Sequence, residues 1–200
     1  PTVDAGVVYV PDWSGTVHAL SVTDGSVLWE RRVEDSTERG SMTFTNAVAL
    51  DGDTLYVGSN SGKTGIVALD ADTGEERWRV ATGPVTGGPV VHDDLLVVQS
   101  HSLVVAYGTD GQRRWGFNLL DRNYHPLAVD DDHVYAAGRE TLSAITHEGE
   151  RSWTHEVGEE RLQVGSPTVA GDSVLLRGED RLLALAAATG EKRWSTAPAG

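Results

Sequence analysis

The sequence predicts an all-β protein made of internal repeats, and three observations support that prediction. One segment recurs five times, with a small Ala, a turn, and a Gly four positions before a Trp: ALSVTDGSVLW (19–29), ALDADTGEERW (68–78), AYGTDGQRRW (106–115), AITHEGERSW (144–153) and ALAAATGEKRW (184–194). An apolar run lies upstream of each copy, and a short turn with Asp or Gly precedes each run. Repeats of this length are typical of stacked or radially arranged supersecondary units.

The spacing of the repeats indicates which architecture they build. The recurring pairs are Gly25 and Trp29, Gly74 and Trp78, Gly111 and Trp115, Gly149 and Trp153, and Gly190 and Trp194. Successive Trp residues of these pairs are 49, 37, 38 and 41 positions apart, a length that suits one four-stranded propeller blade. The predicted fold class is therefore an all-β β-propeller of four-stranded antiparallel blades with five repeats.

We expect one domain over residues 1–200, and the repeats are placed at approximately 1–43, 44–87, 88–125, 126–165 and 166–200. The order of the strands is compatible with two alternatives. Five blades either close a ring or form a segment of a larger ring.

Each repeat is predicted to contain four short strands, A to D. Strand A is a short inner strand that is often opened by Pro, and strand C ends in Ala and an aliphatic residue. Strand B, such as TLYV at 54–57, is apolar at successive positions because neighbouring blades cover both of its faces. Strand D alternates, with Arg77 and Arg79 flanking Trp78, because it lies at the rim.

The recurring Gly and Trp have distinct physical roles in such a blade. The Gly is expected in a left-handed conformation that closes a hairpin turn, where a Cβ would be strained. Each Trp is expected to pack between two blades. Burial of about 150–250 Å², at about 25 cal/mol per Å², is a gross gain of roughly 4–6 kcal/mol.

Composition limits the classes of function. With 39% apolar and 23% charged residues, the chain is expected to fold, and no stretch approaches the 18 to 20 apolar residues of a membrane span. We expect any targeting signal to be removed or to lie outside these residues. The formal charge of −14 disfavours nucleic acid as a partner. Because Cys is absent, disulfides, thiolate catalysis and Cys-ligated zinc are excluded.

The basic residues are almost all arginine, since only Lys63 and Lys192 are lysines against fourteen arginines. This Lys-poor, acidic composition resembles that of proteins from extreme halophiles, and a bacterium with a GC-rich genome is the alternative source.

The stretch VGSNSGKTG (57–65) superficially resembles a phosphate-binding loop. That loop needs G-x-x-x-x-G-K-[ST] followed by a helix whose N-terminus points at the phosphates. Here Val57 stands where the first Gly is required, and the aliphatic segment GIVALD that follows predicts a strand. We therefore predict a polar hairpin loop and no nucleotide binding.

No segment of the sequence has the residue spacing of a known metal-binding or catalytic motif. DADTGEE lacks the EF-hand spacing, because Gly74 is at position 5 and Ala81 at position 12 counted from Asp70. The Asp clusters at 51–53 and 130–132 are expected to cap hairpin turns by Asx-type bonds. The seven His are scattered without an H-E-x-x-H pattern, and GSNSG has Asn60 where a nucleophilic Ser would be needed. The sequence predicts no catalytic, cofactor-binding or metal-binding residue.

The shared Ala, turn, Gly and Trp resemble the tryptophan-docking repeats of pyrroloquinoline-quinone-type β-propellers, over essentially the whole chain. The second copy has Asp70 where the others have Ser21, Gly108, Thr146 and Ala186, and the turn is one residue shorter in the third and fourth copies. These departures weaken individual turns and leave the predicted architecture intact.

The resemblance implies two alternatives for function. Some members of this superfamily are quinone-dependent alcohol or sugar dehydrogenases, which hold pyrroloquinoline quinone with calcium, in many cases beside a disulfide of adjacent cysteines. Others are non-enzymatic, such as outer-membrane assembly lipoproteins. Because this chain has no Cys, we predict a non-catalytic scaffold that binds a protein partner in the cell envelope. A fragment of a quinoprotein dehydrogenase is the alternative.

Two oversized loops are the predicted partner-binding region. The connection after Trp29 to the next strand A has 19 residues, against 11, 11 and 14 after Trp78, Trp115 and Trp153, and the B-to-C loop of the second repeat is also the longest. Both types of loop emerge on one face of an up-and-down blade, and loops on rigid scaffolds often carry function. The candidate residues are Glu34, Asp35, Glu38, Arg39, Asn60, Ser61, Lys63 and Thr64.

Overall fold

The computed structural model describes residues 1–33, 48–60, 64–119, 127–138, 140–157, 166–177 and 181–196. Within these residues the strands form five sheets of four antiparallel strands each, and none of the described elements is a helix. The predicted all-β architecture of four-stranded blades is confirmed.

Each blade is a meander in which every strand pairs with the next one along the chain, so that the first and fourth strands are the edges. The first blade contains β1 (Thr2–Asp4), β2 (Val7–Pro11), β3 (Thr16–Ser21) and β4 (Val27–Arg32). The second contains β5 (Ala49–Asp51), β6 (Thr54–Gly58), β7 (Ile66–Asp70) and β8 (Glu76–Val80). The third contains β9 (Gly87–His92), β10 (Leu95–Ser100), β11 (Leu103–Gly108) and β12 (Arg113–Asn118). The fourth contains β13 (Ala128–Val129), β14 (His133–Ala137), β15 (Thr141–Thr146) and β16 (Arg151–Glu156), and the fifth contains β17 (Thr168–Ala170), β18 (Ser173–Arg177), β19 (Leu182–Ala186) and β20 (Lys192–Thr196).

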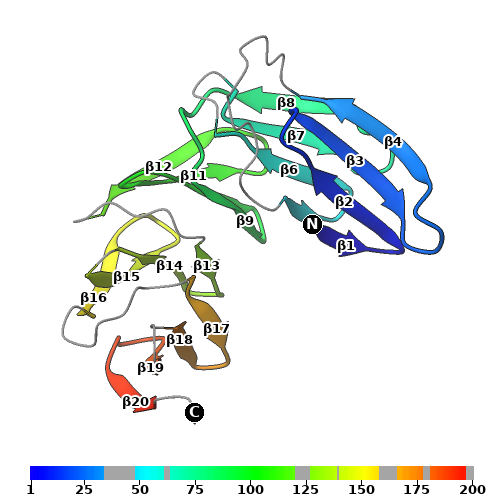
Figure 1. The fold of residues 1–200 in the computed structure, drawn as a ribbon. Coiled ribbons are helices and arrows are strands. Elements are labelled where there is room, and N and C mark those ends of the chain that lie inside the picture. The colour runs from blue at the N-terminus through cyan, green and yellow to red at the C-terminus, as the bar shows by residue number, and fades with distance from the viewer. Residues whose placement is uncertain are drawn as a thin grey trace.

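The blades follow one another along an arc (Figure 1). Strands β9, β13 and β17 lie on the inner side of this arc, and β12, β16 and β20 lie on the outer side. The first blade, in blue, and the fifth, in red, stand at separate ends. Each blade interior to the arc is therefore flanked by two neighbours, whereas the first and fifth blades are flanked by one.

The apolar core lies between the blades. Four clusters of buried side chains each combine residues of two consecutive blades. In the cluster between the first and second blades, Tyr9, Val17 and Ala19 pack against Leu55 and Leu69. Strands β6 and β14 are buried at every position, as predicted for a strand B that is covered on both faces.

Each turn between the third and fourth strands has the backbone conformation expected from its Gly. The φ angles are +72° at Gly25, +72° at Gly74, +82° at Gly111, +89° at Gly149 and +70° at Gly190. Beside each turn the register shifts by one residue immediately after the shared Ala pairs with the Trp, as at Ala68 and Trp78. This β-bulge recurs in all five blades, and in the first four the Trp beside it packs against the Gly turn of the next blade.

Candidate functional site

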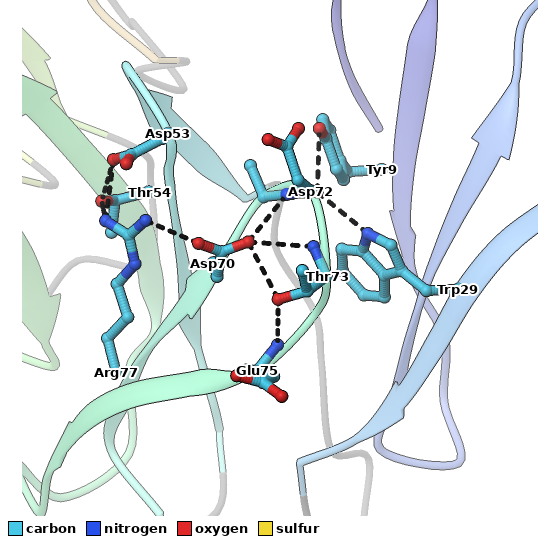
Figure 2. A network of polar contacts seen from close by, with 10 residues as sticks. Tyr9, Trp29, Asp53, Thr54, Asp70, Asp72, Thr73, Glu75 and Arg77 are labelled. Carbon is cyan, nitrogen blue, oxygen red and sulfur yellow. Dashed lines mark hydrogen bonds and ion pairs between the residues drawn. The ribbon is translucent and has the colours of Figure 1, made fainter.

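Trp29 illustrates how one blade docks on the next. Its indole Nε1 donates a hydrogen bond of 2.9 Å to the carbonyl oxygen of Ala71, in the turn after β7 of the second blade. The phenol of Tyr9 donates to the same oxygen at 3.3 Å, and Figure 2 shows both rings directed at this turn. A Cβ added at Gly74 would lie 2.7 Å from a ring carbon of Trp29. The Gly is therefore required both for its positive φ and for the close approach of the ring.

Three further tryptophans repeat this geometry. Trp78 donates to the carbonyl of Thr109 at 2.9 Å, Trp115 to that of His147 at 2.7 Å, and Trp153 to that of Ala187 at 2.8 Å. In each case the ring lies against the Gly of the next blade: Gly111, Gly149 and Gly190. The prediction that each Trp packs between blades is confirmed for these four.

The fifth Trp and the first Gly differ from this pattern. Trp194 is 45% exposed, and its indole donates no hydrogen bond within the described residues. A Cβ added at Gly25 would meet no atom within 4 Å. Val22, whose N–H bonds to the carbonyl of Gly6 as the N–H of Ala71 bonds to that of Asp53, is 56% exposed, whereas Ala71 is 5% exposed. At one end of the arc, the Gly turn of the first blade therefore contacts no Trp of another blade within the described residues. At the other end, Trp194 of the fifth blade contacts no Gly turn of another blade among the described residues.

A second recurring contact ties the fourth strand of a blade to its own first turn. Arg77, the residue before Trp78, pairs with Asp53 at 2.7 Å and with Asp70 at 2.7 Å, as Figure 2 shows. The hydrogen bond from Arg77 lowers the pKa of Asp53 to about 2, and Asp53 in turn raises the pKa of Arg77. Equivalent pairs join Arg114 to Asp94 and Arg193 to Asp172. These pairs were not predicted from the sequence, although three repeats have an Arg directly before the Trp and an Asp directly before the apolar run.

The carboxylates of the turn aspartates accept hydrogen bonds from groups of the protein itself. Asp70 Oδ1 accepts hydrogen bonds from the backbone of Asp72 and from both the N–H and the hydroxyl of Thr73. Asp130 caps its own turn through the N–H groups of Asp132 and His133, as predicted. Asp53, by contrast, bonds to Arg77 and the Thr54 hydroxyl. Within the described residues no three His, Asp or Glu side chains come together in a geometry that could ligate a metal.

The predicted partner-binding loops lie largely outside the described residues. This applies to Glu34, Asp35, Glu38, Arg39, Ser61 and Lys63. Asn60 is partly exposed after β6, and Thr64 is buried at 6% exposure. The loop ends are joined by a bond from the N–H of Ser59 to the carbonyl of Gly65. Because β7 begins at Ile66, the segment leads into a strand and cannot present a helix N-terminus to a phosphate. The antiparallel pairing of β6 with β7 confirms that the segment connects two strands of a hairpin.

The repeat pattern and docking geometry agree with a comparison against known families. The family model described as outer membrane protein assembly factor BamB matches residues 1–67 and 62–200. The chain belongs to this family. The resemblance to pyrroloquinoline-quinone-type propeller repeats, predicted from the Gly and Trp spacing, is confirmed.

Proteins similar to this chain by sequence or by fold include two BamB proteins and a dehydrogenase. The outer membrane protein assembly factor BamB of Xanthomonas campestris pv. campestris is 34% identical over 137 residues, which are 64% of this chain and 33% of that protein. BamB from Moraxella catarrhalis superposes with a TM-score of 0.75 at 22% identity, covering 99% of this chain and 63% of that one. Quinohemoprotein alcohol dehydrogenase from Comamonas testosteroni superposes with a TM-score of 0.76 at 15% identity, covering 100% of this chain and 42% of that one.

At these identities the two superposed structures show a shared fold and nothing further. The matched part of this chain spans 33% of the Xanthomonas protein and 63% of the Moraxella chain. Among the described residues, no helix has the length and apolar character required to cross a membrane.

Proposed function

We propose that this chain is a non-catalytic β-propeller module that binds a protein partner during outer membrane protein assembly in the cell envelope. The observation that carries the proposal is the family match, which extends over the whole chain. The cell-envelope location predicted from the resemblance agrees with the name of the relatives, outer membrane protein assembly factor.

The aspartates that recur at the start of the second strand are held in the ionised form. Asp53, Asp94 and Asp172 recur at one position of three blades, and each is held by an arginine of its own blade. The arginine hydrogen bonds lower the pKa of all three carboxyls. Carboxylates stabilised in the ionised form in this way are poor general acids, because catalysis near neutral pH needs a pKa near the working pH.

The alternative function is that of a quinoprotein dehydrogenase fragment, and the fold of the Comamonas enzyme is its support. Two features count against a site for pyrroloquinoline quinone with calcium. The chain has no Cys to form the adjacent-cysteine disulfide, and the described residues bring together no set of carboxylates that could ligate the ion. Incubation with the quinone and calcium separates the two functions: dye reduction on an alcohol or sugar, with a saturable spectral change, would contradict the scaffold.

Partner binding is placed, in this proposal, on the face formed by the oversized loops. Shortening residues 34–43, or replacing Asn60, Ser61 and Lys63 by Gly and Ser, is expected to abolish partner capture with little change in thermal stability. Thr64 is left unchanged in this variant because it is buried.

Photo-crosslinking in cells tests the assembly role directly. A photoreactive residue in place of Asn60 is expected to crosslink to a component of outer membrane protein assembly. The matched control replaces Thr189, an exposed residue in the turn between β19 and β20, at the other end of the blades. Identical products from both positions, or none from either, would refute the proposal.

We also propose that further blades of the same type cover the two ends of the arc. Val22 and Trp194 support this, because the equivalent residues of neighbouring blades are covered by docking. A longer polypeptide that contains additional G-x-x-x-W repeats is expected to bury Trp194. A fluorescence maximum of Trp194 that stays at its exposed value in such a polypeptide would contradict the proposal.

A further inference from the structure

The fourth blade replaces the rim ion pair of its neighbours by a different contact. In the second, third and fifth blades the residue directly before the docking Trp is an arginine that pairs with an aspartate of its own blade. In the fourth blade this residue is Ser152, and its Oγ lies 2.9 Å from Nε2 of His133. A serine hydroxyl within hydrogen-bond reach of an imidazole is the arrangement by which a base activates a nucleophile.

The β-bulge of the fourth blade determines how this serine is presented. β15 pairs with Trp153 and with Arg151 on either side of Ser152, so Ser152 is the additional residue of the bulge in β16. A bulge changes the direction of the side chain that it carries. Ser152 is exposed, whereas His133, the first residue of β14, is 8% exposed. The hydroxyl can therefore be reached from solvent while the base beside it is shielded.

The contacts of the second ring nitrogen determine which nitrogen of His133 carries the proton. The O–H of Tyr135 donates to Asp130 Oδ2 at 2.7 Å and lies 3.3 Å from the carbonyl oxygen of Ala187. Because both of these oxygens are acceptors, the phenol oxygen acts as an acceptor toward Nδ1 of His133, which is 3.5 Å away. Nδ1 therefore carries the proton, and Nε2 presents its lone pair to the hydroxyl of Ser152. A general base needs this tautomer, since it takes the serine proton at Nε2.

The carboxylate of Asp130 stabilises the positive charge that such a ring acquires. Burial raises the pKa of Asp130, but hydrogen bonds from Tyr135 and from the N–H groups of Asp132 and His133 outweigh it and lower the pKa. Asp130 is therefore ionised near neutral pH. Its negative charge attracts a protonated His133, so transfer of a proton from Ser152 to the ring is electrostatically favoured.

We propose that Ser152 is a covalent modification site that accepts an acyl group from an activated ester or thioester. Ser152 Oγ attacks the carbonyl carbon and forms the new ester bond, while Nε2 of His133 takes the hydroxyl proton. The bond between the carbonyl carbon and the leaving oxygen or sulfur breaks, and the leaving atom receives the proton from Nε2. The products are an acylated Ser152 and a free alcohol or thiol, and the reaction needs no oxidant or reductant.

This inference goes beyond the proposed binding function and does not depend on it. It describes one acyl transfer onto the chain, so it is compatible with a module that performs no catalytic turnover. The two members of the pair are 19 residues apart along the chain, which is why no sequence motif indicates them. The modified residue would lie on the rim of the fourth blade, whereas the oversized loops belong to the first and second repeats.

Reaction of the full chain with p-nitrophenyl acetate tests the inference. We expect a stoichiometric burst of p-nitrophenol, which is the kinetic sign of a covalent intermediate. Tandem mass spectrometry of a protease digest is expected to locate an acetyl group on Ser152. Ser152→Ala is expected to lose both the burst and the label, because it removes the nucleophilic oxygen.

A second variant removes the base and keeps the serine. His133→Leu introduces the residue that the third blade has at this position, Leu95. We expect acetylation of Ser152 to become about a hundredfold slower, which lies within the range of general base catalysis. The matched control is Ser26→Ala, which removes an exposed serine whose hydroxyl donates to Asp24 at 2.8 Å. A carboxylate is a far weaker base than an imidazole, so this control should be acetylated at Ser152 at the unmodified rate.

Tyr135→Phe tests the role of Tyr135 as a positioning residue for the ring of His133. It keeps an aromatic ring in the cluster between the fourth and fifth blades and removes the oxygen that accepts the Nδ1 proton. We expect slower acetylation of Ser152 and a pH profile of acetylation displaced to lower pH, since the protonated ring loses its link to Asp130. Circular dichroism must show that each variant is folded.

Four outcomes would overturn the inference. They are the absence of an acetyl group on Ser152, an unchanged rate in folded His133→Leu, acetylation of Ser26 as fast as that of Ser152, and an unchanged pH profile in Tyr135→Phe. The assay uses the chain without a partner. Its failure is therefore distinguishable from failure of the crosslinking at Asn60, which alone would contradict the assembly role.

Discussion

Trp153 and Trp194 occupy the same position in consecutive blades, yet only one of them is docked. Trp153 donates to the carbonyl of Ala187 and packs against the cluster between the fourth and fifth blades. Trp194 also follows a G-E-x-x-W segment and has the same β-bulge beside it, but it is 45% exposed. A Trp of this repeat contributes to stability only when the Gly turn of a following blade receives it.

The rim shows a different kind of contrast between repeats. The pair formed by Arg77 and Asp53 is lost from the first blade as a unit, since Leu28 and Gly6 replace both members. The exposure of Trp194 follows from its place at the end of the arc. Leu28 is 53% exposed at a position that an arginine occupies in three of the other blades.

The largest expected effect comes from removing a docked Trp. We expect Trp153→Ala to lower the free energy of unfolding by about 3–5 kcal/mol, because it leaves a cavity between two blades. Trp194→Ala should cost below about 2 kcal/mol, since roughly half of that side chain is already in solvent. Urea unfolding of both variants measures the difference. Equal losses would contradict the docking comparison.

Glycine substitutions test the other half of the contact. Gly149→Ala and Gly25→Ala both force a side chain into a left-handed conformation, which costs about 1–2 kcal/mol. Only the Cβ at position 149 also meets a Trp ring, that of Trp115. We therefore expect Gly149→Ala to cost about 1–3 kcal/mol more than Gly25→Ala. Thermal and urea unfolding should agree on this order, and equal costs would show that the ring of Trp115 moves aside without loss of stability.

Salt is expected to raise the stability of the whole chain and to leave the difference in stability between Trp153→Ala and Trp194→Ala unchanged. The net charge is −14, and the Debye length falls from about 10 Å at 0.1 M to about 3 Å at 1 M salt. We expect the Tm to rise steeply with KCl over this range, by a similar amount in Trp153→Ala and Trp194→Ala. A flat profile would argue against the halophile prediction made from composition.

The smallest effect concerns the turn at the start of β3. Asp12 accepts hydrogen bonds from Ser14, from the N–H of Thr16 and from His18. Although burial raises the pKa of Asp12, these bonds outweigh it and lower the pKa to about 2. The unfolded value is about 3.9, so the stabilisation is complete above about pH 4 and is lost as the pH falls toward 2. Asp12→Asn should thus lower the Tm at pH 7, and its difference from the unmodified protein should vanish near pH 2.

The sequence was most informative where a property depends on neighbours along the chain. The positive φ of Gly74 follows from a tight turn four residues before Trp78, and the buried strand β6 follows from its unbroken apolar run. The ion pairs were missed because their members are far apart along the chain. Asp53 and Arg77 are separated by 24 residues, and Asp172 and Arg193 by 21. Thr64 was assigned to a contact surface on loop length alone, which says nothing about its burial.

The amino-acid sequence by itself determined that the chain forms four-stranded blades, where their Gly turns lie and which strands are apolar throughout. These features follow from backbone sterics and from the periodicity of side chains along a strand. Only the tertiary structure decided which tryptophans are docked, which carboxylates are paired and that Trp194 remains partly in solvent. Burial and pairing depend on what stands opposite a residue in space, and the Ala, Gly and Trp shared by the five repeats do not specify that.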